Sequence, residues 1–330
     1  MKEKIWKIPT TKETMLHILN NILNQEVKQS TTKENMLKLL PELYKGENLK
    51  ELIKVISYEA YQGLEKILKY LEDGLTIENA IKKSGYIGND LEEAMIIISR
   101  MSGIEYEYEL SVNPKQLAPM FSTENKKLAQ KYDKIEKLIK GLMYTYGVME
   151  IATLRKMICK YMSEIMPEDE IYKFIFKRLD LNLLLDYHYI HWDNTGEEEC
   201  YISYLDQEKV DIAGIAAEQK GRGLIYKKLK ENQVLERDLC YWDDVTEEFY
   251  KYLKNKNKSI DKKEFAIYAK VNEIGIDVVD QIMNMVDLSS KNEVYEFKEQ
   301  FLKWFKNSPQ YVLGGYTPNE MLKLEGETWE

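Results

Sequence analysis

The feature that most constrains the fold of this chain is a helical spacing of apolar residues that recurs along most of its length. Such residues recur at intervals of three and four through Leu49, Leu52, Ile53, Ile56, Ala60, Leu64, Ile67, Leu68 and Leu71. This spacing predicts one long helix with a single apolar face. With only 16 Gly and 7 Pro in 330 residues, the many tight turns of an all-β protein are not expected. We therefore expect a mainly α, multi-module protein.

Composition narrows the class of protein further. A hydrophobic fraction of 44% is enough to build packed cores, so wholesale disorder is excluded. The net charge of −9 disfavours a protein that binds DNA without regard to sequence, because such proteins usually carry a basic surface. Cys159, Cys200 and Cys240 form neither a CxxC pair nor an even disulfide framework. Without a signal peptide or an apolar span, we expect a soluble cytoplasmic protein with no membrane partner.

Four segments are expected along the chain. Residues 1–46 predict a helical pair, in which Thr10 and Thr31 would each open a helix through a capping box. Residues 47–125 predict a helical module with helices over 49–71, 76–83 and 91–101, closed by a strand in IEYEYEL. This module is a candidate for a diverged copy of the segment that follows, 126–206. Residues 207–330 predict a C-terminal helical domain.

The segment 126–206 has the most distinctive order of elements. Helices are expected over 126–146, in MEIATLRKMICKYM and in PEDEIYKFIFKRL, followed by two β-type runs around the turn DNTGEE. The stretch GLMYTYGVMEIATLRKMICKYM resembles the helix–turn–helix opening of winged-helix domains, where YGVMEIATL would place a short β contact before the second helix. This resemblance implies winged-helix-like segments and small β-hairpins. It rests on element order more than on diagnostic residues.

The C-terminal stretch YVLGGYTPNEM carries a strong helix start, with Thr317 as cap, Pro318 in the first turn and Glu320 closing the box. It resembles a segment of uncharacterised low-GC Gram-positive bacterial proteins that often precedes a cysteine-rich SEC-C motif. The matching residues are Pro309, Gly314, Gly315, Tyr316, Thr317, Pro318, Asn319 and Glu320. The resemblance implies a bacterial or mobile-element origin. The cysteines of that motif are absent here, so the resemblance implies no metal site.

The residue inventory offers no recognisable catalytic constellation. The chain has three histidines, His17, His188 and His191, and strand alternation would place the last two on opposite faces. No zinc spacing and no glycine-rich phosphate loop occurs. We therefore predict a non-enzymatic protein with no cofactor, no metal and no small-molecule ligand. Catalysis by carboxylates or lysines remains open, because acids are too common to single out a pair.

The charges of the winged-helix-like module favour a protein partner over nucleic acid. Glu168, Asp169 and Glu170 open the third helix, and the hairpin tip carries Glu197, Glu198 and Glu199, all of which would repel phosphates. The expected anchors for a protein partner are Tyr172, Phe176, Tyr189 and Trp192, where they are not buried.

The alternative is a nucleic-acid-binding regulator of transcription or replication. It would use a basic face of the same module to contact phosphates, with Lys156, Lys160, Lys173, Lys177 and Arg178 as the contacting residues.

Overall fold

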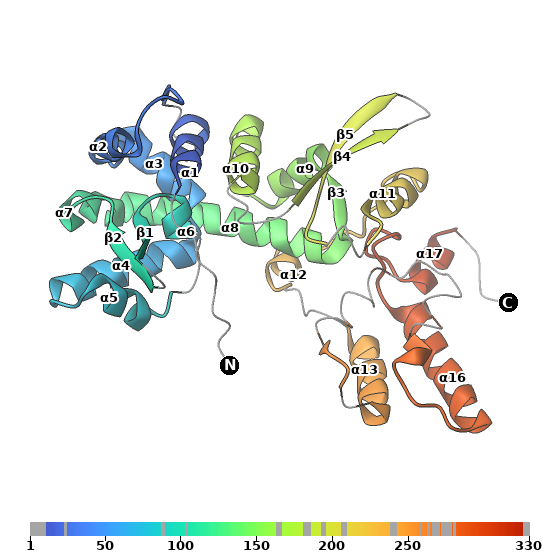
Figure 1. Ribbon diagram of the computed structural model, residues 1–330. Helices are drawn as coiled ribbons and strands as arrows, with labels where there is room; N and C mark the ends of the chain where they lie inside the picture. Colours follow the sequence, from blue (N-terminus) through green and yellow to red (C-terminus); the bar gives the residue numbers. More distant parts are fainter. Residues whose placement is uncertain are drawn as a thin grey trace. The chain divides into compact units, whose positions relative to one another are not determined.

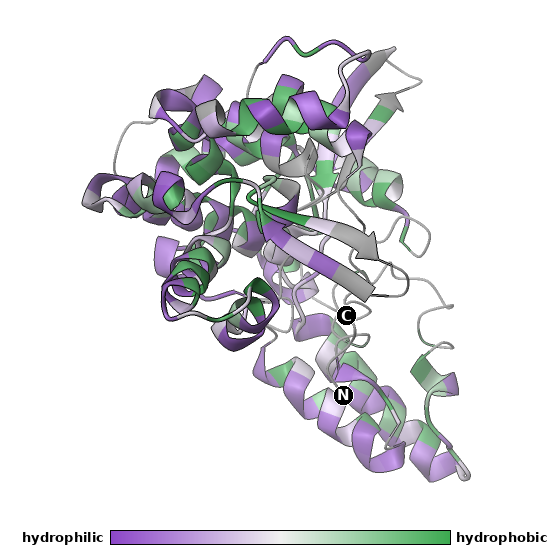
Figure 2. Cartoon of the chain, turned by 60° about the vertical axis from the view of Figure 1, so that its left-hand side comes forward, coloured by the Kyte–Doolittle hydropathy of each residue, from purple (hydrophilic) through white to green (hydrophobic). Residues whose placement is uncertain are grey.

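The protein is mainly α-helical, with small β-hairpins (Figure 1). It divides into two compact units, the first formed by Met1–Glu136 with Pro167–Leu183 and the second by Lys137–Met166 with Leu184–Glu330. The computed structural model describes residues 11–22, 25–86, 90–102, 105–162, 167–180, 186–192, 196–205, 210–237, 243–257, 259–262, 265, 271, 279 and 282–325. In Figure 2 most helices carry both hydrophilic and hydrophobic residues, as amphipathic helices do.

The first unit consists of short helices and one two-stranded sheet. Its elements are α1 (Lys12–His17), the π-helix η1 (Ile18–Ile22), α2 (Lys33–Leu43), α3 (Gly46–Val55), α4 (Tyr58–Glu72), α5 (Ile77–Ser84), α6 (Asp90–Glu93), β1 (Ile97–Ser102), β2 (Glu105–Leu110), α7 (Pro114–Leu117), the 3₁₀ helix η2 (Ala118–Phe121), the first part of α8 (Thr123–Tyr146) and α10 (Glu168–Asp180). One apolar cluster from Met15 to Ala129 forms most of its core.

The long helix expected over 49–71 is wrong, because α3 and α4 are separate helices. Ile56 is extended, with φ −79° and ψ 147°, and ends α3. Ser57 then caps α4, its hydroxyl accepting a hydrogen bond from the Ala60 amide at 3.1 Å. A serine that satisfies an orphan N–H favours a new helix start. Both helices bury apolar residues of the predicted pattern. The helical spacing of these residues therefore continues across the two helices, although the backbone is not helical at Ile56 and Ser57.

The helix expected over 91–101 is also wrong beyond Glu93. Met95 has φ +55°, and the chain then enters β1, which pairs antiparallel with β2 in the register Ile97↔Leu110 to Ser102↔Glu105. The strand expected in IEYEYEL is confirmed as β2 and supplies the partner. The run of isoleucines from Ile96 to Ile98 suits a buried strand, since β-branched side chains pack well on a pleated surface.

The helix caps of the N-terminal repeat lie one residue later than expected. Thr11 accepts from the Thr14 amide at 3.1 Å, and Thr32 accepts from the Asn35 amide at 3.3 Å. Thr31 is therefore not the cap, and Thr10 lies outside the described residues. Where two threonines adjoin, the sequence pattern cannot choose between them.

The capping box predicted in the C-terminal tail is confirmed. The Glu320 amide donates to Thr317 Oγ1 at 3.1 Å, and the Thr317 amide donates to Glu320 Oε2 at 2.9 Å.

The second unit contains a three-stranded sheet and further helices. Its elements are the rest of α8, β3 (Val148–Glu150), α9 (Ile151–Tyr161), β4 (Asp186–Trp192), β5 (Glu197–Ser203), α11 (Ile212–Gly221), α12 (Glu231–Leu235), α13 (Asp244–Lys256), α16 (Lys291–Asn307) and α17 (Pro318–Glu325). The strand order is β3–β5–β4, with both pairs antiparallel. The short β contact expected in YGVMEIATL is present as β3.

The tail around Tyr311 is built into the core of the second unit. The buried Gln219 side chain donates to the backbone oxygens of Tyr146 at 3.0 Å and Tyr311 at 2.8 Å. A Cβ on Gly147, whose φ is +74°, would lie 2.5 Å from the Tyr311 ring. Only glycine therefore fits where the tail crosses the end of α8.

The division into two units differs from the segments expected from the sequence. It passes through α8 between Glu136 and Lys137 and assigns α10 to the first unit. The sequence boundaries at 46, 125 and 206 coincide with none of these positions and stay predictions. None of the helices in the described part of the chain has the length and the apolar run needed to cross a lipid bilayer.

Candidate functional site

The candidate site lies in the first unit, where α10 packs on its neighbours. Ile171, Phe174 and Ile175 are buried on one face of α10, at the spacing of an amphipathic helix. The Phe174 ring lies 5.0 Å from the ring of Tyr132 on α8. Burial of these residues fixes the orientation of α10 and so decides which of its side chains face solvent.

The solvent-facing side of α10 carries a pair of aromatic rings. Tyr172 and Phe176 stack, with centroids 6.2 Å apart and an interplanar angle of 13°. Phe176 is 37% exposed, which is high for a phenylalanine on a helix. We refer to these two residues as the aromatic pair.

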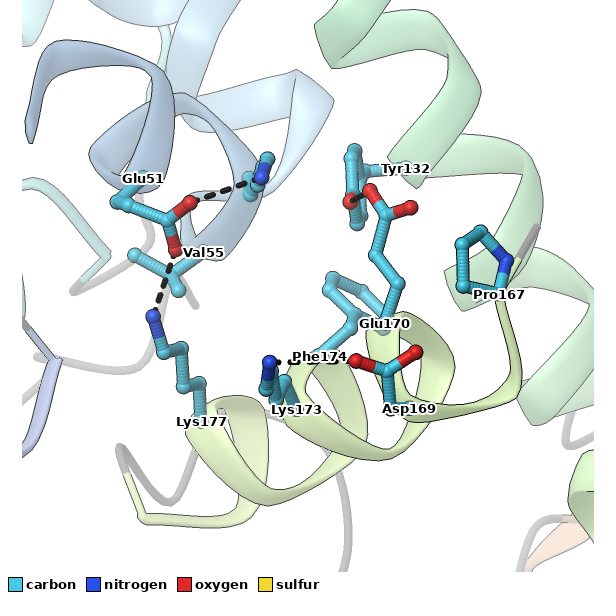
Figure 3. Close-up of a pocket in the computed structure, with 10 residues that line it drawn as sticks. Glu51, Val55, Tyr132, Pro167, Asp169, Glu170, Lys173, Phe174 and Lys177 are labelled. Atoms are coloured by element: carbon cyan, nitrogen blue, oxygen red, sulfur yellow. Dashed lines mark hydrogen bonds and ion pairs between the residues drawn. The ribbon is translucent and has the colours of Figure 1, made fainter. Parts of the chain in front are cut away.

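A pocket of about 300 Å³ opens between α3, α8 and α10 (Figure 3). We refer to it as the charged pocket, since three acids and three lysines line it. The residues around it are Glu51, Lys54, Val55, Tyr132, Pro167, Asp169, Glu170, Lys173, Phe174 and Lys177.

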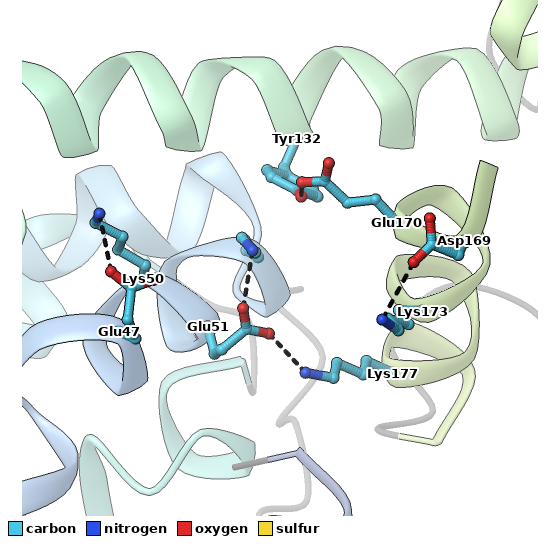
Figure 4. A network of polar contacts seen from close by, with 9 residues as sticks. Glu47, Lys50, Glu51, Tyr132, Asp169, Glu170, Lys173 and Lys177 are labelled. Carbon is cyan, nitrogen blue, oxygen red and sulfur yellow. Dashed lines mark hydrogen bonds and ion pairs between the residues drawn. The ribbon is translucent and has the colours of Figure 1, made fainter. Parts of the chain in front are cut away.

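Glu51 of α3 is the centre of one charged group in this pocket. Its carboxylate accepts from Lys54 at 2.8 Å and from Lys177 of α10 at 2.7 Å (Figure 4). The three side chains are 29%, 25% and 14% exposed, respectively. Burial by itself would raise the pKa of Glu51, but the hydrogen bonds and charges of Lys177 and Lys54 outweigh it and lower the pKa below its ordinary value. Glu51 therefore stays ionised at neutral pH.

Glu170 forms a second polar group with a different partner. The Tyr132 hydroxyl donates to Glu170 Oε1. The pKa of Tyr132 is raised, first by burial and then by the hydrogen bond and charge of Glu170, with a further contribution from Glu51. The phenol is therefore a neutral, protonated donor at neutral pH. Asp169 and Lys173 form an ion pair at 3.3 Å that is exposed on both sides and contributes little to stability.

The structure divides the four expected protein anchors between the two units. Tyr172 and Phe176 lie together on α10, whereas Tyr189 lies on β4 of the second unit, opposite Cys200, and is 60% exposed. The side chain of Trp192 lies outside the described residues.

The expected nucleic-acid contacts are divided as well. Lys173 and Lys177 lie on α10 and are held in ion pairs with Asp169 and Glu51. Lys156 and Lys160 lie on α9 of the second unit, are exposed and form no ion pair with any residue that the structure describes. The side chain of Arg178 is not among the described ones.

The expectation of three exposed acids at the hairpin tip is wrong for Glu199. This carboxylate accepts from Lys220 of α11 at 2.9 Å and from the Tyr201 hydroxyl at 2.9 Å. Glu198 is exposed, and the side chain of Glu197 is not described. The alternation of β5 turns Glu198 and Glu199 to opposite faces, which lowers the negative charge presented at the tip.

Sequence reasoning missed Glu51, Lys54 and Tyr132. Glu51 and Lys54 are spaced three apart on α3, which alone suggests an ordinary surface ion pair. Their link to Lys177, 126 residues further along the chain, exists only in the tertiary structure. No motif connects the two segments, so the sequence held no signal for this pocket.

Comparisons with known proteins identify no relative. No family model matches the sequence, no curated protein matches it, and no solved structure gives a match.

Proposed function

We propose that this protein is a non-enzymatic interaction protein that binds a protein partner through the aromatic pair of α10. The observation that carries this proposal is the exposure of Phe176 on a helix whose other face is already buried. Part of the Phe176 side chain is left in water beside the stacked Tyr172 ring, and covering it by a partner would remove that apolar surface from water. Aromatic side chains of this kind are common anchors in protein interfaces.

We interpret residues 126–206 as a winged-helix-like module. The element order α8–β3–α9–α10–β4–β5 and the sheet order β3–β5–β4 support this interpretation. Because α10 belongs to the first compact unit, the module is not a compact unit by itself. Burial of Ile171, Phe174 and Ile175 orients α10, and we infer that a partner covers the exposed part of Phe176.

We also propose a cytoplasmic location in a bacterium or a mobile element. Cys159 and Cys200 are free thiols, as expected in a reducing compartment. The resemblance of the tail around Gly314 and Gly315 to low-GC Gram-positive proteins supports the bacterial origin.

One observation favours the alternative, a nucleic-acid-binding regulator. Lys156 and Lys160 are four residues apart on α9, so they share a face, and both are exposed. Against it, Lys173 and Lys177 of α10 are each held in an ion pair with a carboxylate. We therefore rank the protein partner first.

Site-specific photo-crosslinking tests the proposal. A photoreactive phenylalanine analogue is placed at Phe176 and, as a control, at Tyr295 of α16, which is 68% exposed. In cells of the source organism, we expect a distinct crosslinked protein at position 176 and not at position 295. The product should weaken when Tyr172→Ala removes the stacked ring. Identical products at both positions, or none at 176, would contradict the proposal.

Duplex binding tests the alternative. If the protein is a nucleic-acid-binding regulator, a labelled DNA duplex should bind at low salt, weaken steeply as salt rises, and bind less well to a Lys156→Glu, Lys160→Glu double variant. The matched control is Lys66→Glu on α4, another exposed lysine. No duplex binding at low salt would remove this alternative.

A further inference from the structure

We propose that the charged pocket binds a small zwitterion, with the ligand carboxylate at the α3 end and its ammonium group at the start of α10. This inference goes beyond the proposed function and does not depend on it, because neither Tyr172 nor Phe176 lines the pocket. The sequence predicted no small-molecule ligand.

The α3 end of the pocket has an excess of positive charge. Lys54 and Lys177 both donate to the single carboxylate of Glu51, so two ammonium groups face one negative charge. Each ammonium has three donors and uses one of them on Glu51 in these contacts. A ligand carboxylate placed here would receive charge-assisted hydrogen bonds and would balance the local charge.

The opposite end has an excess of negative charge. Glu170 accepts a hydrogen bond from the neutral Tyr132 phenol, and it forms no ion pair with the residues that the structure describes. Asp169 beside it forms an exposed ion pair with Lys173. A ligand ammonium placed here would form an ion pair with the Glu170 carboxylate.

The dimensions and walls of the pocket suit a short linear molecule. Its volume of about 300 Å³ is at the lower end for ligand sites. Glu170 and Lys177 are seven residues apart on α10, which corresponds to about 10 Å along the helix axis. Phe174 supplies apolar surface between the charged ends, where methylene groups can lie, with Val55 beside Glu51 at one end and Pro167 beyond Glu170 at the other (Figure 3).

These features predict a clear order of affinities for simple probes. The probes are γ-aminobutyrate, ε-aminocaproate and ω-aminocaprylate, with caproate and hexylamine as analogues that carry one charge each. Binding to the 330-residue protein is measured by ligand-observed saturation-transfer NMR at low salt. We expect at least one ω-amino acid to bind about fivefold or more tightly than both single-charge analogues, since only it satisfies both ends.

Two variants test the two ends separately. Glu170→Gln keeps an acceptor for Tyr132 but removes the negative charge, and Lys54→Gln removes one ammonium from the other end. Each should reduce the affinity for the best ω-amino acid about fivefold or more, whereas Glu65→Gln, an exposed carboxylate on α4, should leave it unchanged. Thermal unfolding confirms that each variant is folded.

Three results would overturn the proposal. They are no saturation transfer for any ω-amino acid, equal binding of caproate or hexylamine, and an affinity that neither Glu170→Gln nor Lys54→Gln changes. None of these results bears on the crosslinking experiment at Phe176, so failure of this proposal and failure of the proposed function are distinguishable.

Discussion

Lys177 of α10 donates to Glu51 of α3 at 2.7 Å, and this ion pair joins residues 126 positions apart in the sequence. Lys177 is only 14% exposed, so the contact is shielded from solvent more than a typical surface pair. The ion pair bridges α3 and α10 within the first unit, and Lys54 shares the same carboxylate.

The first prediction concerns the contribution of this pair to stability. Lys177→Met should lower the free energy of unfolding by about 1–2 kcal/mol, because it leaves the half-buried Glu51 with one partner instead of two. Lys173→Met, which removes only the exposed pair with Asp169, should cost less than about 0.5 kcal/mol. Urea denaturation measures the free energy of unfolding of both variants. Equal losses in Lys177→Met and Lys173→Met would show that Lys177 stabilises the fold no more than an exposed surface lysine does.

The second prediction is a dependence of stability on pH at Glu293 of α16. Hydrogen bonds from the Ser289 hydroxyl and from Lys256 are the main reasons that the pKa of Glu293 is lowered from 4.5 to about 2. Because the pKa is lower in the folded state, the stabilisation is complete above about pH 4.5 and is lost as the pH falls toward 2.

The measurement is the melting temperature of the wild type and of Glu293→Gln across this range. At neutral pH the wild type should have a higher melting temperature than Glu293→Gln. This difference in melting temperature should disappear as the pH falls from 4.5 to 2. Glu299→Gln, which changes an exposed acid on the same helix, is the control and should show no such closing gap. A gap that stays constant over this range would refute the prediction.

The third prediction concerns the close contact between Gly147 and Tyr311. Gly147→Ala should cost about 3 kcal/mol or more, since the residue has φ +74° and the new methyl group would meet the buried Tyr311 ring. Gly196→Ala has a similar φ of +69° with open space around it, and should cost only about 1 kcal/mol. Chemical denaturation of the two variants separates the steric effect from the backbone effect. Similar losses would mean that the ring moves aside.

The fourth prediction separates binding from stability at the aromatic pair. Phe176→Ser should lower the free energy of unfolding by about 1 kcal/mol, because the side chain is 37% exposed and the change also removes its stacking on Tyr172. The same change should weaken capture of the crosslinked partner by more than about 1 kcal/mol, as expected for an interface anchor. Leu302→Ser, another exposed apolar residue on a helix, is the control for binding. A large loss of stability in Phe176→Ser would indicate a packing residue instead.

Local features of the sequence were enough to predict much of the helical structure. The spacing of apolar residues predicts α8 and α16, and the Thr317–Pro318–Glu320 pattern predicts α17 with its cap. The alternation around the turn at Gly196 predicts the β4–β5 hairpin. These signals work because helix caps, tight turns and amphipathic faces depend on residues only a few positions apart.

Tertiary structure decided the features that depend on distant partners. Ile97 and Ile98 join a strand because β2 is there to pair with them, although the same residues fit a helical pattern. The charged pocket exists because burial of Ile171, Phe174 and Ile175 turns Lys177 toward Glu51. Strand pairing and burial depend on contacts between segments that are far apart in the sequence. The spacing of residues within one segment therefore cannot predict them.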